Sequence, residues 1–340
     1  MKLLQSSIVP VAAILCAIVL TSILLLAYQV PPVDALRVLF TGALSTPSRM
    51  SDMLMLAAPL LLCAIGLTVS FAAGQYNLGI EGQMTIGGVA SMWVMRAYQV
   101  GDSVAVFWCA AIVVGAIAGM LWAFFIALLK HYTRVSEIFA GLGLNFVALG
   151  TSLYFVFGPW KRPGVASMSG TEPLDESAWL PTLESTRLAW PTPIIVLCIL
   201  ILIWWVLRHT HWGLQVRASG LSALASARMG VPAVRRMFEA MAVSGGIAGI
   251  AGALQVLGVY HALVPNVASG IGFLGLLVAL LARADIRWVA PLAIFFAMVT
   301  SGSIQLPLAL STDSSIAGVL QGMLVLAMII ARSVQRRGEV

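Results

Sequence analysis

The chain has 340 residues, of which 60% are hydrophobic and 9% are charged, and its mean hydropathy is +0.99. A soluble domain carries about a quarter charged residues, so a globule of this size cannot hide so much apolar surface and lipid must solvate much of it. The formal net charge of +6 does not indicate nucleic-acid binding, because the basic residues fall in short loops between apolar segments. We therefore predict an all-α, polytopic membrane protein with a single transmembrane domain over residues 1–340.

Ten apolar segments follow one another along the chain and are interpreted as membrane spans. The first resembles a signal peptide, but it is long for one and no small-residue cleavage site follows, so we expect it to be retained. The segments 84–97 and 271–282 fall short of the roughly twenty residues of a full crossing, and we predict short or broken helices there. The complete set is 8–28, 52–72, 84–97, 103–129, 137–157, 191–207, 238–258, 271–282, 288–306 and 314–331.

The distribution of Lys and Arg predicts the orientation. With the N-terminus inside and ten crossings, thirteen of the nineteen basic residues lie in inner loops and six lie outside, as expected for cytoplasmic loops. Both termini are then cytoplasmic, residues 208–237 form the largest cytoplasmic loop, and residues 158–190 form the largest external loop. The external loop is interpreted either as a surface cap with interfacial tryptophans or as a landing surface for a binding protein. Residues 31–44 are expected to form an external amphipathic helix.

Several motifs of enzymes and metal proteins are missing from the sequence. It contains no GxxxxGK[ST], no HExxH and no recognisable nucleophile with its base, and its four cysteines lie in apolar segments without a CxxC, as small core residues. Gly270, Gly272 and Gly275 form a GxGxxG, but this motif lies in an apolar span and not after a soluble strand. We therefore expect no enzymatic activity, metal site or bound cofactor in this chain.

The loop 208–237 contains five Arg and two His but no acidic residue. The stretch between Gly220 and Gly230, LSALASARM, is compatible with a rigid helix of about three turns, which would suit a surface on which a soluble motor pushes. The alternative is that the arginines serve positive-inside retention and attract anionic lipid, which explains Arg235 and Arg236 better. The residues predicted to couple to such a motor are Arg217, Gly220, Leu221, Leu224, Ala225, Arg228, Met229 and Gly230.

The stretch 71–88, FAAGQYNLGIEGQMTIGG, places Asn77, Glu81 and Gln83 between two apolar spans. A carboxylate near bilayer depth is costly and is a candidate for function. Glu81 also stands at a helix start, where the helix dipole favours a negative charge. Two interpretations stay open: Glu81 caps that helix and bonds the preceding loop, or it acts directly in a transport pathway or gate.

The stretch 135–150, VSEIFAGLGLNFVALG, begins a helix and carries Asn145 on the same face as Gly141. Asn145 either bonds a neighbouring helix or lines a solute route. The predicted pathway or gate residues are Asn77, Glu81, Gln83 and Asn145. The GxxxG pairs Gly115/Gly119, Gly245/Gly249 and Gly318/Gly322 indicate close helix packing, within the bundle or across a dimer.

These stretches resemble a known family. FAAGQYNLGIEGQM resembles the AGxxNIGxEGQ segment of the nucleoside-type permeases of bacterial ABC importers, which are related to ribose-type and branched-chain amino-acid permeases. VSEIFAGLGLNFVALG resembles their NEVIxTLMLNYIA segment, and residues 213–237 resemble their cytoplasmic loop G…RAxGxNxxAARYAGI. The likeness covers about residues 50–330. The chain departs from the pattern at Leu221–Ser222, at 141–143 and at Tyr76, which leaves the fold prediction intact and the solute open.

The resemblance implies a transmembrane subunit of an ABC importer in the bacterial cytoplasmic (inner) membrane. It implies a second permease subunit, similar or identical, and cytoplasmic ABC ATPase subunits that bind the ATP and Mg²⁺ and act through the 220–230 helix. It also implies an external substrate-binding protein that delivers a nucleoside or related sugar.

Other functions stay open on the residues themselves. The solute could be a branched-chain amino acid or a pentose. A secondary transporter that uses Glu81 as its proton or sodium site would need no ATPase. An intramembrane enzyme has the least support, for want of a catalytic constellation.

Overall fold

The computed structural model describes residues 31–162, 164, 170–184 and 186–310, together with Ser22, Leu26 and Gly322. In this part of the chain every regular element is helical, apart from the isolated bridges Lys161–Thr171 and Thr182–Ala189. Apart from Ser22, Leu26 and Gly322, the predicted spans 8–28 and 314–331 lie outside the described residues, and so does Gly318 of the pair Gly318/Gly322. The chain divides into two compact units, residues 57–293 and residues 1–56 with 294–340.

In the described part of the smaller unit, a short amphipathic helix packs on a long one. Helix α2 (Pro32–Thr41) begins with Pro32 at its first position and continues into the 3-10 turn η1 (Gly42–Leu44). Its Ala35 and Leu39 are buried against Val299 and Leu306 of α12 (Ile286–Leu310). The helix predicted within residues 31–44 is therefore present.

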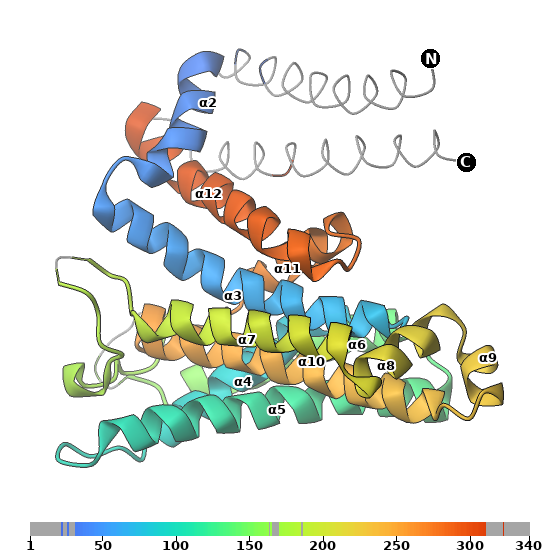
Figure 1. Cartoon of the computed structure of the whole chain (residues 1–340). Coiled ribbons are helices and arrows are strands. Elements are labelled where there is room, and N and C mark those ends of the chain that lie inside the picture. Colours follow the sequence, from blue (N-terminus) through green and yellow to red (C-terminus); the bar gives the residue numbers. More distant parts are fainter. Residues whose placement is uncertain are drawn as a thin grey trace, which may run out of the picture. The chain divides into compact units, whose positions relative to one another are not determined.

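The larger unit is a helical bundle (Figure 1). Helix α3 extends into it from the smaller unit, and α12 leaves it. The elements are α3 (Pro47–Ala72), α4 (Ile80–Met95), α5 (Val104–Thr133), α6 (Glu137–Phe157), the 3-10 turn η2 (Glu176–Ala178), α7 (Pro191–His209), α8 (His211–Leu221), α9 (Ala223–Arg228), α10 (Ala233–Gln255), the π-helix η3 (Val256–Tyr260) and α11 (Ile271–Leu281).

The centre of the bundle is formed by glycine-to-glycine contacts between α4, α5 and α10. A Cβ on Gly119 of α5 would lie 2.8 Å from Gly249 Cα of α10, and one on Gly87 of α4 would lie 2.5 Å from Gly249 O. Gly115 and Gly245 meet the facing helix in the same way. Small residues let helix backbones approach closely where lipid supplies no hydrophobic force between helices. Two of the predicted GxxxG pairs therefore pack within the bundle.

Six described helices are long and apolar enough to cross a membrane. They match the predicted spans at 52–72, 103–129, 137–157, 191–207, 238–258 and 288–306. The two predicted short spans are the 16-residue α4 and the 11-residue α11. Helix α4 begins at Ile80, four residues before the predicted start. The helix includes the polar residues Glu81 and Gln83, which are buried inside the bundle. Cys63 is buried as predicted, whereas Cys109 and Cys198 are exposed.

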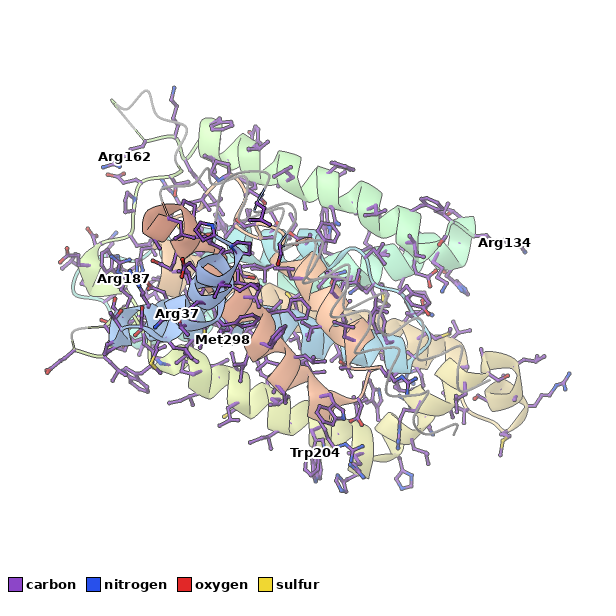
Figure 2. The ribbon with its side chains drawn as sticks, turned by 90° about the horizontal axis from the view of Figure 1, so that it is seen from above. Arg37, Arg134, Arg162, Arg187, Trp204 and Met298 are labelled. Atoms are coloured by element: carbon purple, nitrogen blue, oxygen red, sulfur yellow. The ribbon has the colours of Figure 1, made fainter. Side chains whose placement is uncertain are left out.

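Basic residues mark two opposite ends of the larger unit. Figure 2 shows Arg134 at one end and Arg162 and Arg187 at the other. The end with Arg134 also carries α8 and α9, and the opposite end carries the loop 158–190 (Figure 1). The predicted orientation likewise places Arg134 on the opposite side of the membrane from Arg162 and Arg187. On α7, Trp204 points outward from the bundle (Figure 2).

Candidate functional site

The predicted pathway residues meet where α3 turns into α4. We call residues 73–79 the α3–α4 turn. Helix α3 ends at Ala72, and Gly74 adopts a left-handed conformation with φ of +71° that reverses the chain. The turn brings Asn77 against Gln83 in the first turns of α4. The two amides exchange hydrogen bonds, with Asn77 Nδ2 donating to Gln83 Oε1 at 2.8 Å and Gln83 Nε2 donating to Asn77 Oδ1 at 2.8 Å.

This amide pair is fully buried and reaches a third helix. Asn77 Nδ2 also lies 3.0 Å from Ser244 Oγ of α10, and neither Asn77 nor Gln83 is exposed to solvent. Buried polar groups without partners cost about 1–3 kcal/mol each, so these bonds favour one arrangement of α3, α4 and α10. The sequence pointed to Asn77 and Gln83, whereas Ser244 carried no signal beyond its place in a glycine-rich segment.

Asn145 joins α6 to the same turn. Its Nδ2 donates to Leu78 O at 2.9 Å, and its Oδ1 accepts from Gly82 N at 2.9 Å. One turn earlier, Gly141 lies against Gly79, since a Cβ on Gly141 would be 2.6 Å from Gly79 N. Asn145 and Gly141 therefore share the face that contacts the turn, and the amide bonds a neighbouring segment. A role for Asn145 in a solute route stays a prediction.

Glu81 binds the start of a different helix from its own. Its Oε1 accepts a hydrogen bond from Phe273 N at 3.1 Å, in the first turn of α11. A Cβ on Gly272 would lie 3.1 Å from the same oxygen, so glycine is needed there for the carboxylate to approach. A negative group at a helix N-terminus is favoured by the unpaired N–H groups and the helix dipole. Neither sequence interpretation contained this contact, which spans 192 positions.

The GxGxxG of α11 serves helix packing. Gly270 ends the preceding loop with φ of +80°, and Gly275 faces α3, where a Cβ would lie 2.8 Å from Cys63 Cβ. Gly272 and Gly275 bring α11 close to α4 and α3, whereas a Cβ on Gly270 would meet nothing within 4 Å.

The predicted coupling helix is shorter than expected. Helix α8 runs through Gly220 to Leu221, and the break falls at Ser222, which has φ of −159°. Ser222 Oγ accepts from Ala225 N and caps α9, which has only six residues. The prediction of one helix of about three turns from Gly220 to Gly230 is therefore wrong. A serine is a strong N-cap because its hydroxyl competes for backbone N–H groups, and this local signal was overlooked.

The α8–α9 segment, residues 211–230, carries most of its predicted coupling residues on its surface. Gly230 ends it with φ of +81°, and Gly220 is partly buried against the α3–α4 turn. Leu221 is 90% exposed and Met229 is 84% exposed. The exposed predicted residues of this segment are Arg217, Leu221, Leu224, Ala225, Arg228, Met229 and Gly230.

Glu239 links α8 to α10, a contact that was not predicted from the sequence. It accepts from Trp212 Nε1 at 2.7 Å and from Arg235 Nε at 2.8 Å, and it pairs with Arg236. Arg236 also donates to Gln215 Oε1 at 2.7 Å. Arg235 and Arg236 thus form ion pairs with Glu239, in addition to their predicted role in membrane orientation. The i,i+4 spacing of Arg235 and Glu239 was the available signal.

A second ion pair lies at the same end of the bundle. Lys130 Nζ lies 3.0 Å from Glu137 Oε1 and donates to Gln75 Oε1 of the α3–α4 turn at 2.7 Å. Tyr76 N also faces Glu137 Oε1, at 3.4 Å. The turn is therefore tied to α5 and α6 as well as to α10.

At the opposite end, part of the loop 158–190 is hydrogen-bonded to residues 261–263, which follow η3. Leu174 N donates to His261 O at 2.7 Å, and the rings of Trp179 and His261 stack with centroids 4.1 Å apart. Thr171 N donates to Leu263 O at 2.9 Å. The loop therefore caps this end of the bundle. Whether it also receives a binding protein stays a prediction.

We expect this cap to loosen in acid. Partial burial lowers the pKa of His261 below its ordinary value, and the bond to Leu257 O only partly offsets this effect. The fold thus favours the neutral imidazole, so its contribution is complete above the unfolded pKa of about 6.5 and is lost as the pH falls below it. Exchange of the Leu174 amide, corrected for its intrinsic rate, should rise several-fold between pH 7.5 and pH 5. His261→Phe keeps a ring on Trp179 and should abolish this pH dependence; an unchanged dependence would contradict the assignment.

Six apolar helices, a buried polar junction of the α3–α4 turn with α4 and α10, and a basic, surface-exposed helical segment define an integral membrane protein of the permease class. Residues 49–331 match the family described as the permease component of branched-chain amino acid transport systems. The chain belongs to this family, and the resemblance seen in the sequence is confirmed.

Similar proteins extend over most of the chain. The guanosine ABC transporter permease protein NupP of Bacillus subtilis (strain 168) is 25% identical over 332 residues, which cover 96% of this chain and 93% of NupP. The glucose ABC transporter permease protein TsgB13 of Haloferax volcanii is 26% identical, covering 96% and 88%. The nucleoside ABC transporter permease protein NupB of Lactococcus lactis subsp. cremoris is 25% identical, covering 87% and 83%.

Proposed function

We propose that the chain is the transmembrane subunit of an ATP-driven importer in the inner membrane and forms the route for a nucleoside or a related sugar-like solute. Membership of the permease family supports this function, and the relatives named for guanosine, nucleosides and glucose support the solute class. ATP and Mg²⁺ act in a partner ATPase, and this chain is not an enzyme.

The proposed coupling to the ATPase rests on the surface of the α8–α9 segment. Its six-residue helix is held at both ends, by the Ser222 cap and by Val231 N donating to Ser226 O at 2.9 Å. It nevertheless exposes the large apolar side chains of Leu221, Leu224 and Met229 next to Arg228. A stiff element with exposed apolar and basic groups, outside any span, suits a protein partner.

The proposed topology has ten spans with both termini and the α8–α9 segment in the cytoplasm. The excess of Lys and Arg on that side supports this orientation. The loop 158–190 then faces outward, where a substrate-binding protein docks, and a second permease subunit completes the route.

Reconstitution tests the energy source and the solute together. Proteoliposomes that contain the permease, its ATPase and its binding protein are expected to import radiolabelled guanosine only with internal ATP, and import should survive a proton ionophore. Unlabelled glucose, ribose and leucine as competitors separate the sugar, pentose and branched-chain alternatives. Import by the permease alone that the ionophore abolishes would favour the secondary transporter with Glu81 as its ion site.

The coupling surface is tested at Ala225, an exposed residue of α9. Ala225→Glu places a charge among the apolar groups that contact the ATPase, so we expect loss of ATPase co-purification or of ATP-dependent import with unchanged membrane insertion. Burying a charge in an interface costs several kcal/mol, hence import should fall on the order of a hundredfold. The matched control is Thr133→Glu, at the exposed end of α5. Normal import by Ala225→Glu would exclude α9 from the interface.

A further inference from the structure

Gly220 in the last turn of α8 and Gly74 in the α3–α4 turn meet through their backbones. A Cβ on Gly220 would lie 2.8 Å from Gly74 N and would also meet Ala72 O. A Cβ on Gly74 would lie 3.1 Å from Gly220 O and 3.2 Å from Gly220 Cα. The three atoms nearest to a Cβ on either glycine all belong to backbone, so a rotamer change cannot absorb a displacement of α8 at this contact.

Gly74 itself is constrained on both sides. Its φ of +71° is accessible to glycine at low cost, and its N–H donates to Phe71 O at 2.9 Å. The next residue is held by Gln75 N donating to Ser70 O at 2.9 Å and by the bond from Lys130 to its side chain. The turn is therefore a stiff element that joins α8 to α3 and α5.

The other side of the turn lines a cavity of about 210 Å³. Phe71, Gly74, Gln75 and Tyr76 form one wall, and the C-terminal end of α11 with two residues beyond its C-cap Ala282 forms the other: Ala279, Leu280, Arg283 and Ala284. Arg283 and Ala284 both have φ of +55°. Two successive left-handed residues other than glycine cost about 1–2 kcal/mol each, which is typical of segments that change conformation.

Helix α11 is thus next to the α3–α4 region at both of its ends. Its first turn is bonded to Glu81, which follows the turn by two residues, and its last turn faces Gly74 across the cavity. A shift of the turn changes the cavity wall and, through α4, the position of the Glu81 carboxylate.

We propose that Gly220 and Gly74 are positioning residues for transport: their contact passes the movement of the α8–α9 segment to the α3–α4 turn, and the turn passes it to α11 across the cavity. This inference rests on the proposed function, in which an ATPase acts on the α8–α9 segment. It adds the receiving element inside the membrane domain, namely residues 73–79, and the helix that responds.

The first experiment measures ATP hydrolysed per guanosine imported by the reconstituted complex. Gly220→Ala and Gly74→Ala separate the two backbones, so the ratio is expected to rise on the order of tenfold, within the usual range of coupling free energies. Co-purification of the ATPase should stay unchanged. The control is Gly143→Ala on α6, whose Cβ would meet nothing within 4 Å. Should guanosine not be the solute, the transported competitor of the reconstitution assay replaces it.

A merely structural role would lower import and hydrolysis in proportion and leave the ratio unchanged, and that result would overturn the proposal. So would normal import by both glycine variants. Where Gly220→Ala fails to assemble, Gly74→Ala decides in the same way. Gln75→Ala tests the stiffness of the turn separately, since it removes the bond from Lys130 without touching the glycine contact.

The second experiment follows the movement itself. Nitroxide labels at Ala227→Cys in α9 and at Leu280→Cys in α11 are compared in a background without the four native cysteines. A non-hydrolysable ATP analogue should change both spectra in the unmodified complex. With Gly74→Ala only the α9 label should respond; a response at both labels would overturn the relay. No response at α9 even without the glycine variant would instead refute the proposed site of ATPase action, so the two failures are distinguishable.

Discussion

Gly249→Leu is expected to prevent formation of the folded bundle. Gly249 lies where α10 meets both α4 and α5, and its neighbours are the backbones of Gly87 and Gly115. A leucine there has no cavity to enter, and overpacking costs about 1–3 kcal/mol even where neighbouring side chains can move. Since whole domains are stable by about 5–15 kcal/mol, and backbone must move here, we expect most of the protein to be lost as aggregate.

The measurement is the monodisperse fraction in detergent and its thermal midpoint. Gly143→Leu and Gly150→Leu are matched controls, because both glycines lie on the exposed face of α6 and a Cβ on either meets nothing within 4 Å. They should keep the unmodified midpoint. A Gly249→Leu protein that is as stable as these controls would show that the three helices separate there without loss of the fold.

Glu81→Ala is expected to lower import strongly while the subunit still assembles. The substitution removes the acceptor for Phe273 N and the negative charge at the start of α11. Loss of a capping group costs about 0.5–2 kcal/mol, which corresponds to a fall in import on the order of tenfold if the position of α11 controls transport. Glu81→Gln keeps an oxygen acceptor but loses the charge, so its import rate should lie between that of Glu81→Ala and that of the unmodified protein.

The comparison is made on ATP-driven guanosine import, normalised to assembled complex. Asp102→Asn is the control, because Asp102 Oδ2 also accepts from a backbone N–H, that of Gln99 at 3.0 Å, but at an exposed turn. It should import normally. Normal import by Glu81→Ala would remove Glu81 from the gate and leave the carboxylate without a role in transport.

Features set by local pattern could be predicted from the sequence. Apolar segment length gave the described spans, and the GxxxG spacing of Gly115 and Gly119 indicated the close packing seen with α10. Asn145 was recognised as an amide whose position requires a hydrogen-bonding partner, and the structure places that partner in the α3–α4 turn. In each case the physical cause lies within one helix or at its surface.

Features that depend on distant partners could not be predicted. Glu81 bonds a residue 192 positions away, and nothing in the periodicity of α4 or α11 indicates that their N-termini meet. The break between α8 and α9 was missed for a different reason. Glycine often marks a helix boundary, but Gly220 lies inside α8, where it contacts Gly74, and Ser222 ends the helix.

The buried pair of Asn77 and Gln83 has a consequence for the kind of driving force that can act on it. Both side chains are carboxamides, which neither gain nor lose a proton in water at any physiological pH, and Ser244 is equally inert. The strength of this junction is therefore the same in alkaline and acidic cells and at high and low ionic strength. A displacement of the α3–α4 turn, α4 or α10, which carry these three residues, does change it.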